Sequence, residues 1–336
     1  MKLILGNVIF LISSFYILGC KSPNEAINNT RKWEDVTFNL TGEKLRDIKL
    51  HNNVLYLSTY TSIYKYENNN WKEYINVSPY AVADFEFKSD TLFILTRTNK
   101  VLYLDDKDSL RVKCSVDRSI LPANDLLIYG NDFYIGGSSQ SPFNYGLTKI
   151  SGSLVYNFPM INYSAPYDVY RIEQQGNSIF IGTIIAGRYF VAKMENGILG
   201  PIGINANKKP IGECYSMLSF NEKLLVGSKG QVLSFENNQW TVYKKELPTI
   251  INTELVDKAI SLCAIDTTIL VGTINSGVLA YDNNSNQWTA YCNTGLPTNQ
   301  AINKILRVDN NIFALAGKYN FDDTFSGCVY KINTDN

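Results

Sequence analysis

The sequence predicts an all-β fold built from seven four-stranded sheets, and three observations support this prediction. A unit in which a polar turn precedes a short apolar strand recurs seven times from residue 45 onward. The starts of the apolar strands lie 37, 41, 46, 45, 45 and 43 residues apart, a period typical of propeller blades. The composition, with 37 Asn and 22 Tyr in 336 residues, favours many turns and many strands. We therefore predict a seven-bladed β-propeller over residues 33–336.

The chain begins with an expected export signal. Met1 and Lys2 form a short basic start, residues 3–18 are mostly apolar, and a polar stretch follows Cys20. This layout is that of a secretory signal, and a Cys at the cleavage point resembles a bacterial lipoprotein signal. The resemblance implies that Cys20 becomes an acylated N-terminus. A plain signal peptide and an uncleaved anchor are the alternatives. The expected division is a signal peptide over 1–19, a tether over 20–32 and the propeller over 33–336.

Each repeated unit is expected to contain four antiparallel strands. The second strand of every unit is its apolar segment, and the seven segments are 56–59, 93–96, 134–137, 180–183, 225–228, 270–273 and 313–316. The turns before them are rich in Asn, Asp and Gly, which tolerate the left-handed conformations of tight hairpins. Trp71, Trp240 and Trp288 each open a fourth strand.

The remaining tryptophan, Trp33, predicts how the ring closes. The seventh unit ends with its third strand, 328–332, so its fourth strand is missing. Trp33 opens the segment 33–38, which has no first three strands before it. We therefore expect 33–38 to supply the fourth strand of the seventh blade, which removes the exposed edges of an open stack of sheets.

Several segments resemble a known family. The sequence LPTN at 296–299, INKI at 302–305 and LVGT at 270–273 look like the two-component regulator propeller repeat, with Leu-Pro pairs also at 121–122 and 247–248. In that family the repeat forms the extracytoplasmic sensor of many hybrid histidine kinases of Bacteroidetes. The resemblance implies the propeller fold and an extracytoplasmic location.

Composition argues against several functions. The 31 basic and 31 acidic residues balance, which disfavours nucleic-acid binding. A single histidine, His51, cannot build a site with two imidazoles, and we expect it to be solvated in the first hairpin turn. The acidic segments 105–108 and 322–323 lack the spacing of a calcium loop. No cofactor, metal or catalytic residue set is expected, and the five cysteines after Cys20 are too widely spaced to predict disulfides.

Long loops with aromatic and cationic side chains are the expected ligand-binding features. The loops 137–146 and 317–327 and the connection 159–168 should gather on one face of the ring, and aromatic anchors with a few cations suit a peptide or glycan surface. The candidate residues are Arg97, Phe143, Tyr145, Tyr163, Tyr167, Arg188, Lys229, Tyr319, Phe321 and Phe325.

The sequence thus favours a non-catalytic binding module of the cell envelope. The expected location is the outer membrane, through acylated Cys20, and the expected partner is an envelope protein, a peptide or a glycan. Two alternatives stay open: a polysaccharide lyase or hydrolase that uses carboxylates from different blades, and a structural subunit of an envelope assembly.

Overall fold

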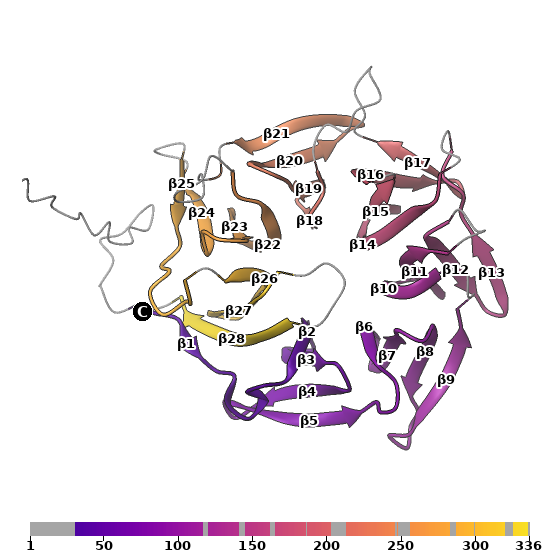
Figure 1. The fold of residues 1–336 in the computed structure, drawn as a ribbon, viewed down its shortest axis with the longest axis horizontal. Coiled ribbons are helices and arrows are strands. Elements are labelled where there is room, and N and C mark those ends of the chain that lie inside the picture. The colour runs from indigo at the N-terminus through magenta and orange to yellow at the C-terminus, as the bar shows by residue number, and fades with distance from the viewer. Residues whose placement is uncertain are drawn as a thin grey trace, which may run out of the picture.

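The computed structural model describes most of the chain from residue 31 onward. The described residues are 31–116, 120–140, 145–161, 165–185, 187–202, 213–245, 247, 256–282, 287–298, 300–319 and 325–334. They form a seven-bladed β-propeller around a central axis (Figure 1). The expected signal peptide, Cys20 and most of the tether lie outside these residues. Among the described residues, no helix has the length and apolar character needed to cross a membrane.

The seven blades each have four antiparallel strands, as the repeat predicted. Blade 1 contains β2 (Lys44–His51), β3 (Val54–Thr59), β4 (Ser62–Glu67) and β5 (Asn70–Asn76), from the axis outward. Blades 2 and 3 contain β6 (Val82–Lys88), β7 (Thr91–Thr96), β8 (Lys100–Leu104) and β9 (Leu110–Ser115), then β10 (Ile120–Tyr129), β11 (Asp132–Ser139), β12 (Leu147–Ser151) and β13 (Leu154–Asn157).

The later blades repeat this arrangement. Blade 4 contains β14 (Tyr167–Gln175), β15 (Ser178–Ile185), β16 (Arg188–Glu195) and β17 (Ile198–Ile202). Blade 5 contains β18 (Ser216–Phe220), β19 (Lys223–Gly227), β20 (Gln231–Glu236) and β21 (Gln239–Lys245). Blade 6 contains β22 (Ala259–Ile265), β23 (Thr268–Thr273), β24 (Val278–Asp282) and β25 (Gln287–Ala290). Blade 7 contains β26 (Ala301–Val308), β27 (Asn311–Gly317), β28 (Phe325–Asn333) and the N-terminal β1 (Glu34–Asp35).

The strand β1 closes the ring where the sequence predicted. It pairs antiparallel with β28, with Glu34 opposite Lys331 and Asp35 opposite Tyr330. Trp33, just before it, is 2% exposed, and its backbone N–H donates to the carbonyl of Thr294 at 2.9 Å. After β1 a short 3-10 helix (Phe38–Leu40) leads to β2. The seventh blade is therefore built from both ends of the propeller segment (Figure 1).

The hairpin turns explain the abundance of asparagine. Asn52 and Asn53 between β2 and β3 have φ values of 47° and 60°, and Asn68 and Asn69 between β4 and β5 have 51° and 59°. These are left-handed conformations, which asparagine adopts more readily than most residues because its side chain bonds to the local backbone. The Asn-rich composition thus follows from repeated hairpins.

Apolar side chains fill the spaces between neighbouring blades. Trp71 of blade 1 packs in a cluster with Phe313 and Val329 of blade 7, and its indole N–H donates to the Val36 carbonyl at 2.8 Å. Tyr134 of blade 3 similarly shares a cluster with Tyr167 and Phe190 of blade 4. Each of these two clusters joins neighbouring blades. The apolar side chains are thus used between blades, and polar side chains of the innermost strands can face the axis.

A β-bulge occurs at one equivalent position in six of the seven innermost strands. The extra residues that the six bulges accommodate are Arg46, Ala83, Asn124, Tyr170, Ile260 and Asn303. A bulge shifts the alternation of side chains by one position and bends the strand. Each of these strands can therefore present a polar residue to the axis next to an apolar residue that packs between blades.

Candidate binding site in the central channel

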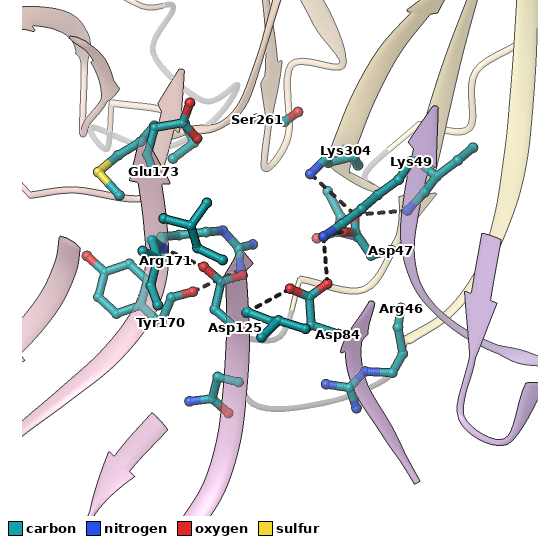
Figure 2. A pocket seen from close by; sticks show the side chains of 18 of the residues that line it. Arg46, Asp47, Lys49, Asp84, Asp125, Tyr170, Arg171, Glu173, Ser261 and Lys304 are labelled. Carbon is teal, nitrogen blue, oxygen red and sulfur yellow. Dashed lines mark hydrogen bonds and ion pairs between the residues drawn. The ribbon is translucent and has the colours of Figure 1, made fainter. Parts of the chain in front are cut away.

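A cavity of about 520 Å³ lies on the axis of the propeller, and all seven innermost strands line it. Figure 2 shows charged side chains converging on it from blades 1, 2, 3, 4 and 7. Five carboxylates face four cations around the wall, and these residues are Asp47, Asp84, Glu86, Asp125 and Glu173, and Arg46, Lys49, Arg171 and Lys304. The cavity is thus polar and nearly balanced in formal charge.

The lining follows the repeat. In every blade, one residue of the innermost strand lies opposite the third residue of the apolar segment in the second strand. These seven innermost-strand residues are Asp47, Asp84, Asp125, Arg171, Ser216, Ser261 and Lys304. Their spacings of 37, 41, 46, 45, 45 and 43 residues are the spacings of the repeat itself. We call these seven residues the axial ring.

Three members of the axial ring accept a hydrogen bond from a backbone N–H of the next blade. Asp84 Oδ2 accepts a hydrogen bond from the backbone N–H of Leu126 in blade 3 at 2.9 Å. Asp125 Oδ2 accepts one from the N–H of Ile172 in blade 4. Ser261 Oγ accepts one from the N–H of Ile305 in blade 7 at 2.8 Å. In each pair the donor follows an axial-ring residue directly, so the same contact is used at three blade junctions.

Lys49 is the most heavily paired cation of the cavity. Its Nζ lies 3.0 Å from Asp84 Oδ1, 3.0 Å from Glu86 Oε2 and 3.8 Å from Asp47 Oδ2. Burial opposes its charged form, but the three carboxylates outweigh this effect and hold the pKa of Lys49 well above its ordinary value. Lys49 therefore joins blades 1 and 2 as a permanent cation.

Asp47 lies between two cations. Lys304 of blade 7 reaches it with Nζ 3.3 Å from Oδ1, and Lys49 approaches its other oxygen. Burial alone would raise the pKa of Asp47, but Lys304 and Lys49 more than compensate and lower it. Asp47 therefore remains ionised and connects blade 7 with blade 1 at the point where the ring closes.

Asp125 and Glu173 have the opposite tendency. Burial, reinforced by the nearby charge of Asp84, raises the pKa of Asp125 to about 7. Burial also raises the pKa of Glu173, whose Oε1 accepts the N–H of Ser219 at 3.0 Å. Within the described part of the chain, neither carboxylate forms an ion pair, in contrast to the carboxylates around Lys49. These two groups are the carboxylates that the wall stabilises least.

A group of tyrosines lies at the end of the channel that carries the loops between second and third strands. Tyr215, just before β18, lies 5.3 Å from the ring of Tyr189 in blade 4, and Lys258 Nζ lies 4.6 Å from the Tyr215 ring centre. Tyr319, from blade 7, packs against the same cluster and lines the cavity. Aromatic rings from three blades therefore meet at this end.

The structure places the predicted binding residues in different environments. Tyr319 lines the cavity, whereas Arg188, the first residue of β16, and Lys229, shortly after β19, are exposed. Arg97 is half-buried, and its backbone N–H donates to the Ala81 carbonyl at 2.8 Å. Two tyrosines pack between blades 3 and 4. Tyr145 is partly buried there, and Tyr167 is 1% exposed and donates its hydroxyl to the Phe158 carbonyl. The side chains of Phe143, Tyr163, Phe321 and Phe325 lie outside the described residues.

The expectation for His51 was wrong in its detail. His51 ends β2 rather than standing free in the turn, and its ring stacks on Phe87 with centres 4.1 Å apart and planes at 1°. The side chain is only 20% exposed, and Nε2 lies 3.8 Å from Asp90 Oδ1. Stacking against the neighbouring blade, rather than solvation, determines its position.

The charged residues of the channel were missed at the sequence level. A signal for them exists, because a polar residue precedes an apolar one in the innermost strand of each unit, as in Asp47-Ile48, Asp84-Phe85 and Lys304-Ile305. Aligned by the repeat, these residues fall at one position. Each charge by itself resembles the ordinary polar alternation of a strand surface, so the pattern appears only when the seven repeats are compared.

The described residues offer no ready metal centre. Among them, no three His, Cys, Asp or Glu side chains are grouped as ligands for a metal ion, although three aspartates stand in the axial ring. The cysteines that form no disulfide are Cys114, Cys214, Cys263, Cys292 and Cys328. The charged and polar side chains of the cavity wall can form ionic contacts and hydrogen bonds with a ligand.

Comparison with known proteins identifies the fold. No family model and no curated protein sequence matches the chain. The extracellular domain of BT4673 from B. thetaiotaomicron, assigned to a one-component or a hybrid two-component system in two structures, matches with a TM-score of 0.65 at 13% and 14% identity. The match covers 89% of this chain and 39% of that chain, so this chain spans less than half the length of the BT4673 structures.

The resemblance to two-component regulator propellers is confirmed at the level of the fold.

Other propellers of similar fold have different roles. Virginiamycin B lyase from Staphylococcus aureus matches with a TM-score of 0.64 and 12% identity over 90% of this chain and 98% of the lyase. YCF48 bound to a D1 peptide matches with a TM-score of 0.64 and 12% identity over 90% of this chain and 97% of YCF48. These neighbours include an enzyme and a peptide-binding protein, so the fold by itself does not select a function.

Proposed function

We propose that this protein is a non-catalytic binding module of the cell envelope and that its ligand occupies the central channel. The observation that carries the proposal is the 520 Å³ cavity, whose wall combines charged side chains from five blades with tyrosines at one end. A concave site with a few fixed polar groups and aromatic surface is the usual form of a ligand pocket.

The structural neighbours support the same class of function. BT4673 contributes an extracellular domain to a signalling system, and YCF48 binds a peptide. We extend these roles to an extracytoplasmic module that recognises an envelope protein, a peptide or a glycan. Acylation of Cys20 would hold it at the outer membrane through the tether 20–32, since multiple acyl chains give stable anchoring.

A binding assay with the soluble fragment 21–336 tests the proposal. The fragment is incubated with arrays of peptides and envelope glycans, and both retention and product release are measured. Retention of one class without turnover supports the binding module. Release of a shortened glycan or peptide would contradict it and favour the enzyme, and failure to retain any array member or any envelope protein would reject the module altogether.

Membrane attachment needs a separate test. The substitution Cys20→Ser removes the thiol that would be acylated, so the protein should move from the membrane fraction to the soluble fraction. The measurement is fractionation of cells that produce either form. Equal membrane association of the two forms would contradict lipidation without bearing on ligand binding.

A further inference from the structure

Arg171 is the charged side chain of the axial ring that blade coupling leaves unexplained. Where Asp84, Asp125 and Ser261 bond to the next blade, Arg171 donates from Nη1 to the carbonyl of its own neighbour Tyr170 at 3.0 Å. Within the described part of the chain, its guanidinium makes no ion pair, and the side chain is exposed to the lumen. Its other N–H donors have no hydrogen-bond acceptor among the described residues.

Two acceptors stand beside this donor. Glu173 lies two residues further along β14, and residues two apart in a strand share a face, so its carboxylate lines the same wall as Arg171. Asp125 comes from β10, the innermost strand of the neighbouring blade 3, and lies next to the Arg171 guanidinium in Figure 2. Each uses one oxygen for a backbone N–H and keeps the other without a hydrogen bond from the described residues.

Among the described residues, the opposite wall carries no charge. The residues that blades 5 and 6 contribute to the cavity are uncharged, and they are Tyr215, Ser216, Met217, Ile260, Ser261 and Leu262. The cavity therefore has an ionic side on blades 1 to 4 and 7 and an uncharged side on blades 5 and 6. A ligand that fits both sides needs charged groups at one edge and apolar groups at the other.

The charge balance indicates what kind of charge the ligand carries. A lone anion at Arg171 would meet five carboxylates around the wall, and a lone cation at Glu173 would meet Arg171 and three further cations. An uncharged polyol would displace water from Arg171 and Glu173 without bringing an opposite charge to ion-pair distance of either, and a charge away from water without a close partner is costly. A molecule with one positive and one negative group avoids all three costs.

We propose that the lumen binds a small zwitterion, a free amino acid or short peptide, whose carboxylate pairs with Arg171 and whose ammonium group pairs with Glu173 and Asp125. Its apolar side chains lie against the uncharged wall of blades 5 and 6, where Met217 is partly exposed. This inference rests on the proposed binding function and names the ligand class for the same site. The guanidinium fork suits a carboxylate because it offers two parallel donors.

Isothermal titration with leucine, Leu-Leu and Leu-Leu-Leu tests the inference, because these three probes keep both charges and differ in length. Acetyl-Leu-Leu lacks the ammonium charge, Leu-Leu amide lacks the carboxylate, and cellobiose is an uncharged probe of similar size. We expect at least one zwitterion to bind. We expect each blocked form to bind about ten- to hundredfold more weakly than its parent, the loss expected for a hydrogen bond to a charged group.

Variants separate the two contacts. Arg171→Gln should weaken binding of Leu-Leu about ten- to hundredfold and should not weaken binding of Leu-Leu amide further. Glu173→Gln keeps an acceptor for the Ser219 N–H and should reproduce the loss seen with acetyl-Leu-Leu. Arg171→Lys keeps the positive charge without the two parallel donors of the guanidinium. Its affinity for Leu-Leu should lie between that of the native protein and that of Arg171→Gln. Arg111→Gln, on the outer strand β9 where Arg111 pairs with Asp105, is the matched control and should bind as the native protein does.

The outcomes distinguish this inference from the proposed function. If no zwitterion binds, if blocked and free peptides bind equally, or if Arg171→Gln and Arg171→Lys both bind natively, the inference is overturned. Binding of cellobiose alone would also overturn it, while the proposed binding function would stand. Circular dichroism of each variant identifies those that fail to fold, and the comparison of blocked with free peptides on the native protein needs no variant.

Discussion

Lys49 holds the polar centre of the first two blades together. It is 18% exposed and faces Asp47, Asp84 and Glu86, all within 3.8 Å. Removing one partner of a buried ionic network costs more than the network contributes, because the remaining charges stay buried without compensation. Lys49 is therefore a residue at which a single substitution should have a large effect on stability.

We expect Lys49→Met to lower the free energy of unfolding by about 3–5 kcal/mol. Chemical denaturation measures this change. Lys223→Met is the control, because Lys223 pairs with Glu236 at 3.0 Å in a partly exposed position where such pairs contribute about 1 kcal/mol or less. Adding Asp84→Asn and Glu86→Gln to Lys49→Met should recover part of the loss. Equal effects of the two lysine substitutions would show that the network does not stabilise the fold.

Asp125 should make stability depend on pH in a defined direction. Its pKa is raised to about 7 by burial and by Asp84, from an ordinary value of 3.8. Between these values the folded state binds more protons than the unfolded state, so the contribution of Asp125 to stability is fully present below pH 3.8 and is lost as the pH rises through 7.

Asp125→Asn removes this dependence and keeps an oxygen that can accept the Ile172 N–H. The variant should therefore gain stability relative to the native protein as the pH rises from 5 to 8, by roughly 1–3 kcal/mol since one pKa unit corresponds to about 1.36 kcal/mol. Thermal unfolding of both proteins at several pH values measures the difference. A difference that is constant with pH, or that shrinks toward pH 8, would contradict the assigned pKa.

At the scale of elements, the closing strand β1 depends on the residue before it. Trp33 is 2% exposed and packs with Ile305, Tyr330 and other residues of blades 6 and 7. Gly295 lets the chain pass close to it, because a Cβ at Gly295, where φ is +90°, would lie 2.2 Å from the Trp33 carbonyl oxygen. The two ends of the ring are thus fitted to each other at this contact.

Trp33→Ala should lower the free energy of unfolding by about 3–5 kcal/mol, the cost of removing a large aromatic side chain from a core. Denaturation curves measure it, and hydrogen exchange should show the largest loss of protection in β28 and β1. Phe38→Ala is the control, because Phe38 is 49% exposed and follows the same strand. Destabilisation by Phe38→Ala as large as that by Trp33→Ala would argue against closure through the Trp33 contact.

The elements of the fold were predictable because each has a local signature. The spacing of apolar segments, the Asn turns and the lone Trp33 led to seven blades and to closure by the N-terminal strand. The channel was not predictable in the same way. Ring closure brings Asp47 beside Lys304, which is distant in sequence. A bulge also decides that Asp47, rather than its neighbour Arg46, pairs with the second strand β3. His51 was misplaced for a related reason, since its partner Phe87 belongs to the next blade.

At the scale of the whole molecule, the seven blades divide the cavity into two unlike sides. Charges come from blades 1 to 4 and 7, whereas the described residues of blades 5 and 6 present tyrosine, serine and apolar side chains. A propeller that served only as a rigid spacer would have no need of an exposed arginine without a close ion pair in its lumen. This asymmetry is why we assign binding to the axis rather than to the loops alone.

A crystal structure of the protein grown with Leu-Leu tests the central claim, that the channel of the closed ring is the ligand site. We predict density for the dipeptide inside the lumen, with its carboxylate within hydrogen-bond distance of the Arg171 guanidinium and its ammonium group near Glu173 and Asp125. An empty lumen at saturating Leu-Leu, or dipeptide found only on the outer loops, would contradict the claim.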